Sequence, residues 1–86
     1  MTTNNERDTK FLGFANREID RLEQKRLIPI HPKSLRNDMA ILLAQCAYDL
    51  VLHAFRDVDT YDLDYMPKST YEQSIMPTIQ DMDELP

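Results

Sequence analysis

The stretch LRNDMAILLAQCAYDLVLHAF, residues 35–55, runs for 21 residues without glycine or proline. Ser34 precedes it as a candidate N-cap, and the pattern predicts a helix over residues 35–56. At about 100° per residue, apolar side chains occupy nearly the whole circumference of this helix. Only a narrow strip stays polar, formed by Asp38, Gln45, Asp49 and Arg56. This helix therefore decides the fold, because an element that is apolar on most sides must be buried.

The segment before it predicts a second, ordinary amphipathic helix over residues 10–27. Its apolar residues recur at spacings of three and four, and they are Phe11, Leu12, Ala15, Ile19 and Leu22. Pro29 ends the helical pattern. The two helices form a helical hairpin in residues 1–56, and the fold class is all-α. One amphipathic helix covers only one side of its neighbour, so a further element must cover the rest.

Three elements are candidates for that cover: a second copy of the chain, the C-terminal residues folding back, or a different protein. We expect a two-fold dimer, in which two hairpins form a four-helix bundle with the second helices at its centre. The face lined by small side chains is the predicted self-association surface, comprising Ala40, Ala44, Ala47, Tyr48, Val51 and Phe55. The alternative is that the C-terminal residues cover the helix alone.

Residues 57–86 form an acidic arm. Residues 1–56 hold nine Lys or Arg against seven Asp or Glu, whereas residues 57–86 hold Lys68 alone against eight acids. Pro67, Pro77 and Pro86 punctuate the arm, so we expect it to be mostly non-helical. Ser69 and Glu72 fit a capping box, which predicts one short helix near residues 70–75 that stops at Pro77.

The arm also carries more aromatic and methionine side chains than a solvating tail needs. We therefore expect it to dock on its own body or on a protein partner, with plain disorder as the alternative. Acidic side chains would steer the encounter and tyrosine and methionine would anchor it. The predicted partner-binding residues are Asp57, Asp59, Tyr61, Asp62, Asp64, Tyr65, Met66, Tyr71 and Met76.

The spacing of the acidic residues argues against a calcium loop. Such a loop needs glycine at its sixth position and glutamate at its twelfth, and counting from Asp57 these positions hold Asp62 and Lys68. The only glycine, Gly13, excludes the glycine-rich loops that hold phosphates. We expect no cofactor.

The chain has one cysteine and two histidines, too few for a structural zinc site within one chain. Cys46 and His53 lie seven residues apart on one helix, roughly 10 Å along its axis, which is too far for a nucleophile and its base. We interpret them as core residues, although a site shared across a dimer axis stays open, and we expect His31 to be exposed. No catalytic residue and no metal ligand is predicted.

These observations lead to three hypotheses about function. The first is a small, non-catalytic, protein-binding or regulatory adaptor of the cytoplasm, whose acidic arm engages a basic, partly apolar protein surface. The second is a structural or assembly component whose arm packs on, or exchanges between, its own subunits. The third is a nucleic-acid-associated regulator, which the acidic arm disfavours because it repels phosphates. The polar N-terminus and the lack of a long apolar run predict no membrane insertion.

Overall fold

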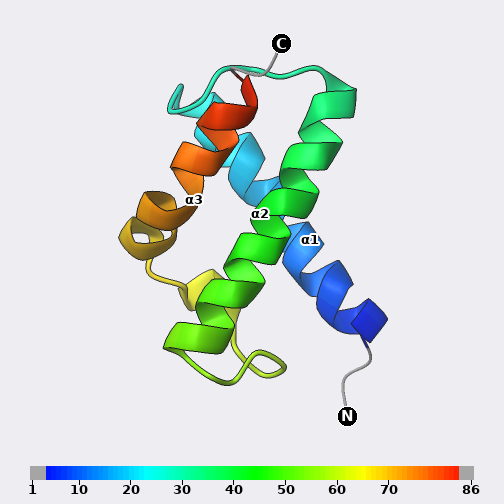
Figure 1. Cartoon of the computed structure of the whole chain (residues 1–86), viewed down its shortest axis with the longest axis vertical. Coiled ribbons are helices and arrows are strands. Elements are labelled where there is room, and N and C mark those ends of the chain that lie inside the picture. Colours follow the sequence, from blue (N-terminus) through cyan, green and yellow to red (C-terminus); the bar gives the residue numbers. More distant parts are fainter. Residues whose placement is uncertain (1–3, 84–86) are drawn as a thin grey trace.

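The computed structural model describes residues 4–83 of the 86-residue chain, and this part is built from helices alone. The elements are α1 (Asn4–Gln24), α2 (Lys33–Ala54), the short 3-10 helix η1 (Leu63–Tyr65) and α3 (Lys68–Asp83). In Figure 1, α2 crosses in front of α1, and α3 lies beside α2. The prediction of an all-α fold is confirmed.

Helix α1 begins six residues before the predicted start at residue 10, because no proline or glycine interrupts the polar residues that precede it. It ends at Gln24, earlier than the predicted residue 27, in a Schellman motif. Arg26 adopts a left-handed φ of 59°. The Leu27 amide donates to the Leu22 carbonyl at 2.9 Å, and the Arg26 amide donates to the Glu23 carbonyl at 3.1 Å. The backbone thus leaves the helix before it reaches Pro29.

Helix α2 begins at Lys33 rather than residue 35 and ends at Ala54 rather than residue 56. The prediction that Ser34 caps it is wrong, because the N-cap is Pro32. Extended backbone at Pro32, with ψ 156°, aims its carbonyl along the helix, where it accepts from the Arg36 amide at 2.9 Å. At the other end Arg56 has a φ of 68°, and its amide donates to the Val51 carbonyl at 2.8 Å.

The prediction of a mostly non-helical arm is wrong. Helix α3 extends over 16 residues, far beyond the short helix expected near residues 70–75, and continues through Pro77. Tyr71, Ile75 and Ile79 lie four residues apart and form one buried stripe, with 1%, 2% and 0% of their surfaces exposed. Burying such side chains contributes about 1.5–3 kcal/mol each, which together exceeds the cost of about 3 kcal/mol for an interior proline.

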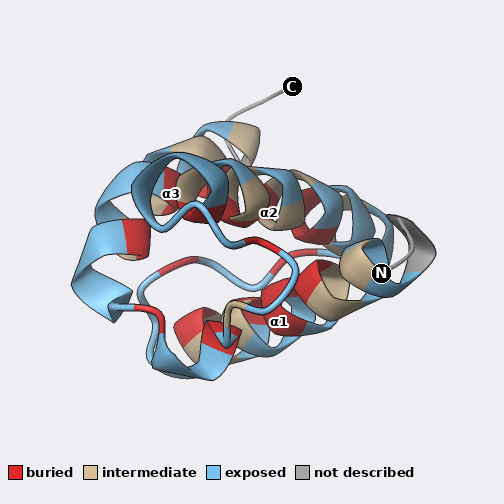
Figure 2. Cartoon of the chain, turned by 90° about the horizontal axis from the view of Figure 1, so that it is seen from below, coloured by how far each residue is buried: buried red, intermediate tan, exposed pale blue. Residues whose placement is uncertain are grey.

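The hydrophobic core contains residues from both parts of the chain, the hairpin of residues 1–56 and the acidic arm that follows it. Figure 2 shows the buried residues turned inward between α1 on one side and α2 and α3 on the other. The arm supplies six of its seventeen residues: Val58, Leu63, Met66, Tyr71, Ile75 and Ile79. The described part of the arm therefore packs on its own body and covers part of α2. The dimer stays a prediction.

Candidate functional site

The connection between α2 and α3, here called the acidic loop (residues 57–66), presents four of the predicted site residues on one short segment. Asp57, Asp59, Asp62 and Asp64 are all exposed. Three apolar side chains of the same segment are buried, namely Val58, Leu63 and Met66, with 8%, 4% and 4% of their surfaces exposed. The three buried side chains thus hold the loop against the core, and the four carboxylates are exposed to solvent.

Two local turns hold the loop. The Asp57 carboxylate accepts from the Thr60 amide at 3.3 Å and from the Thr60 hydroxyl, and the Tyr61 amide donates to the Asp57 carbonyl at 3.1 Å. The hydrogen bonds from Thr60 lower the pKa of Asp57. Asp62 caps η1, because its Oδ1 accepts from the Asp64 amide at 3.0 Å. Short aspartate side chains commonly stabilise turns in this way.

Helix α1 contributes two cations beside the loop. The Lys10 ammonium donates to the Tyr61 carbonyl, and the Arg17 guanidinium lies 3.3 Å from the Asp64 carboxylate. Both members of the Arg17–Asp64 pair are exposed, so the pair contributes little stability. Within residues 4–83, the other three carboxylates of the loop have no ion-pair partner within 4.0 Å.

The two tyrosines of the loop differ in their surroundings. Tyr65 is exposed over 81% of its surface, the largest value for any aromatic side chain of the described residues. Tyr61 stacks on Phe55, with ring centroids 4.7 Å apart and an interplanar angle of 29°. Burial and the neighbouring Asp62 carboxylate raise the pKa of Tyr61. The structure therefore brings an exposed aromatic ring and four carboxylates together.

Three other predicted anchors lie elsewhere. Met66 and Tyr71 are buried in the core, and Met76 is half-buried on α3. Tyr71 packs edge-on against Phe14, with ring centroids 5.5 Å apart. These side chains bind the arm to its own body, and they are not part of the surface that the loop presents.

The hydroxyl of Tyr71 belongs to a polar network between α1 and α3. It donates to the Glu18 carboxylate and accepts from the Arg21 guanidinium at 2.7 Å. Arg21 also pairs with Glu18 at 2.7 Å and with Glu72. Burial raises the pKa of Tyr71, and the bond to Glu18 raises it further. Burial disfavours the charge of Arg21, but the bonds to Glu72, Glu18 and Tyr71 outweigh burial and raise its pKa.

The residues predicted for self-association divide into two groups. Ala40, Ala47 and Val51 have no exposed surface, because α1 and α3 cover them. The other three, Ala44, Tyr48 and Phe55, keep part of their surface exposed. An interface built on the first group would require a single chain to open.

A groove of about 530 Å³, which the sequence pattern did not indicate, lies beside that second group. Its lining comes from the first half of α1 and the middle of α2: Arg7, Asp8, Phe11, Leu12, Ile41, Ala44, Gln45, Tyr48 and Asp49. The Arg7 guanidinium lies 4.6 Å from the centroid of the Tyr48 ring and donates to its hydroxyl at 3.3 Å. Arg7 and Asp8 line the groove because α1 begins at Asn4. The predicted helix began at residue 10 and so did not include these two residues.

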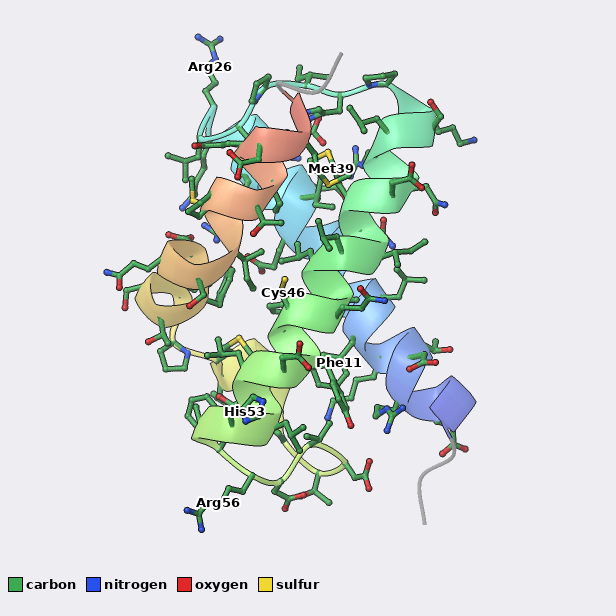
Figure 3. The ribbon with its side chains drawn as sticks, viewed as in Figure 1. Phe11, Arg26, Met39, Cys46, His53 and Arg56 are labelled. Atoms are coloured by element: carbon green, nitrogen blue, oxygen red, sulfur yellow. The ribbon has the colours of Figure 1, made fainter. Side chains whose placement is uncertain are left out.

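The remaining candidates for chemistry are scattered. Cys46 is half-buried, and burial raises the pKa of its thiol, whereas His53 is exposed. Figure 3 shows the two side chains at separate levels of α2. The expectation that His31 is exposed is wrong, because the connection after α1 folds over the core and leaves 6% of its surface exposed. Among the described residues, no three His, Cys, Asp or Glu side chains are grouped to hold a metal ion.

None of the helices within residues 4–83 combines the length and apolarity needed to cross a membrane. Comparisons with protein-family models, with curated proteins and with solved structures found no match to this chain.

Proposed function

We propose that this chain is a non-catalytic protein-binding adaptor, whose acidic loop engages a basic, partly apolar protein surface. The observation that carries the proposal is the fastened loop: four exposed carboxylates and the 81% exposed ring of Tyr65 on a segment held by three buried side chains. Carboxylates of one sign steer a basic partner during the encounter. An exposed tyrosine supplies a contact of large area once the partner has arrived.

The geometry of the loop favours this proposal over a loose acidic tail. The turns at Asp57 and Asp62 order the backbone before any partner binds. A segment that is already ordered loses less conformational entropy on binding. Of the anchors predicted from sequence, Tyr65 and Tyr61 belong to this surface, and Phe55 extends it through its stack with Tyr61.

A peptide titration tests the proposal. The probe is a short synthetic peptide of alternating lysine and leucine, and the observable is the set of backbone amide shifts of the labelled full-length chain. We expect shifts concentrated in residues 57–66 and binding that weakens as salt is added. A peptide in which serine replaces leucine should bind less well, because it lacks the apolar contact.

Charge variants give the matched control. The loop variant carries Asp57→Asn, Asp59→Asn, Asp62→Asn and Asp64→Asn, which keep one oxygen acceptor for the backbone amide in each turn. The control variant removes four exposed carboxylates from other surfaces: Asp8→Asn, Asp38→Asn, Asp49→Asn and Asp81→Asn. We expect binding to the loop variant to weaken by about tenfold or more, and binding to the control to weaken less. Equal weakening would contradict the proposal.

The second candidate is an assembly component whose arm exchanges between subunits. It is favoured by the six core residues that the arm supplies, since the same contacts form if α3 docks on a neighbouring copy. Refolding at high concentration, followed by mass measurement, tests it: an exchanged dimer would form and persist on dilution. The role of a nucleic-acid regulator is supported less, because Arg21 and Arg36 are held in ion pairs with acidic side chains of α1 and α3.

A further inference from the structure

Helix α2 carries a line of side chains that its own chain covers only in part. Ile41, Leu52 and Phe55 are exposed over 44%, 41% and 37% of their surfaces. With Gln45 and Tyr48 they follow one another at spacings of four, three, four and three residues. We call this line the seam: Ile41, Gln45, Tyr48, Leu52 and Phe55. This spacing is that of the a and d positions of a coiled-coil heptad, through which two helices pack along each other.

The seam lies along a side of α2 that the neighbouring helices leave partly open. Arg7 and Phe11 of α1 contact Tyr48 at its edge. Figure 1 shows α1 behind α2 and α3 beside it, and no described helix lies in front. The residues of α2 that these two helices cover are a different set: Met39, Ala40, Leu43, Ala47 and Val51. The seam borders the groove between α1 and α2, which shares Ile41, Gln45 and Tyr48 with it.

Four residues of the seam, Ile41, Gln45, Tyr48 and Leu52, are self-complementary in one direction only. Consider a second copy of α2 that runs antiparallel, with a two-fold axis at the point midway between residues 46 and 47. Ile41 then faces Leu52 of the second copy, and Gln45 faces Tyr48 of the second copy. Ile41 and Leu52 thus meet across the pair, whereas Phe55 lies across from Asp38 of the second copy. The central amide meets a hydroxyl with which it can form a hydrogen bond.

The charges that flank the seam select the same direction. In the antiparallel register Asp38 lies near Arg56 of the second copy, and the two-fold axis repeats this pair at the other end. Both side chains are exposed, and Figure 3 shows Arg56 extending away from the end of α2. A parallel pair would instead place Asp38 beside Asp38, Asp49 beside Asp49 and Arg56 beside Arg56. Antiparallel helices also align their dipoles favourably.

We propose that the seam binds a second copy of this chain, as an antiparallel, two-fold pair of α2 helices with α1 and α3 outside it. The pair leaves Ala40, Ala47 and Val51 in the core of each chain. The carboxylates of the acidic loop lie outside the seam, and the two surfaces meet where Phe55 stacks on Tyr61. About 21 Å of helix separates Ile41 from Phe55, so the contact is small and its dimer dissociates on dilution.

Sedimentation equilibrium over a wide concentration range tests the pair. We expect the full-length chain to shift from monomer to dimer as concentration rises, and Leu52→Glu to weaken association by at least about tenfold. Circular dichroism should show unchanged helix content. A wild-type chain that stays monomeric at the highest concentration, or a dimer that Leu52→Glu leaves intact, would overturn the proposal.

Two charge reversals test the register and do not depend on the apolar substitution. Asp38→Arg and Arg56→Glu each place like charges together in the homodimer, so each variant alone should associate less well than wild type. A mixture of the two variants restores both opposite-charge pairs, so the mixed dimer should form again. The matched controls Asp81→Arg and Lys68→Glu change exposed residues of α3 and should leave association unchanged. Failure of the mixture to associate, with both variants folded, would exclude this register.

Discussion

Both halves of the arm are acidic, but they have different roles. The acidic loop holds four Asp among ten residues, and α3 holds Glu72, Asp81 and Asp83 against Lys68. In the acidic loop, the buried residues Val58, Leu63 and Met66 are unevenly spaced, so the backbone is fastened at separate points and presents its carboxylates outward. In α3, the buried residues recur every fourth position, so one whole face of a helix joins the core. The comparison shows that the spacing of apolar residues, and not acidity, determines which half of the arm forms a buried helix face.

The largest effect on stability is expected when α3 is removed. A chain that ends after Met66 loses Tyr71, Ile75 and Ile79 from the core and leaves one side of α2 uncovered. For a domain of this size we expect the loss of several kcal/mol to abolish cooperative unfolding. Urea unfolding followed by circular dichroism measures this loss. A truncated chain with a sharp, wild-type transition would show that residues 1–66 fold alone and would break the comparison.

The next effect concerns Pro77, which interrupts the hydrogen bonds of α3. Pro77 lacks an amide proton, so the carbonyl of Gln73 has no helical donor; Gln73 is exposed, and an open hollow of the α3 surface includes both residues. Replacing Pro77 with alanine should restore the bond and stabilise the chain by about 1–3 kcal/mol. The urea midpoint measures the change. The exposed Gln73→Ala serves as the control, and a destabilised Pro77→Ala chain would contradict the assignment of a continuous helix.

A smaller effect is expected at the hydroxyl of Tyr71, which links α3 to Glu18 and Arg21. Tyr71→Phe removes both hydrogen bonds and keeps the ring, so it should cost about 1–2 kcal/mol near neutral pH. Urea unfolding of the variant and wild type measures it. Tyr65→Phe, at an 81% exposed ring, should change little.

The same variant predicts a dependence on alkaline pH. The pKa of Tyr71 lies above its ordinary value of 10.0 in the folded chain, chiefly because the residue is buried. The stability that its neutral hydroxyl contributes is therefore fully present below about pH 10 and is lost as pH rises above that value. Wild type should lose more stability than Tyr71→Phe between about pH 8 and pH 11. Parallel losses in the two chains would contradict this origin.

The smallest effect on stability is expected in the acidic loop. The loop variant with four Asp→Asn substitutions retains the acceptors of the two backbone amides and loses only the exposed acceptor of the Thr60 hydroxyl. The exposed Arg17–Asp64 pair contributes little. Its urea midpoint should match that of wild type, even though its peptide binding is reduced. A large drop in the urea midpoint would show that the loop carboxylates stabilise the folded chain. The loop and α3 would then not differ in their contribution to stability.

Sequence patterns predicted the two long helices because α1 has a periodic apolar face and α2 is a long run without glycine or proline. They failed for α3 because Pro77 was interpreted as a stop. The spacing of Tyr71, Ile75 and Ile79 was visible in the sequence, and tertiary burial decided in its favour. The helix ends were missed by a few residues, since Pro32 caps α2 through its backbone and Arg26 ends α1 through a left-handed φ.

The candidate site was predictable in part. Exposed aspartates follow from their charge. Tyr65 beside them is exposed, and its role as an anchor stays a prediction. The burial of Met66 and Tyr71 did not follow, because identical side chains serve either a core or a partner and only the path of the backbone decides between them. The groove depends on two residues of α1 that lie before its predicted start, so no pattern within residues 10–27 indicated it.

Arg26 and Arg56 stand in backbone conformations that usually belong to glycine, and Figure 3 shows their side chains extending from opposite ends of the molecule. An arginine-specific protease would therefore find its first cleavage points there, in the two connections between long helices. Cleavage after Arg56 would divide the chain at the point where its charge changes sign. The two pieces would nevertheless stay together, because the shorter piece carries one third of a shared interior, and the nicked molecule would migrate as a single species until a denaturant separated it.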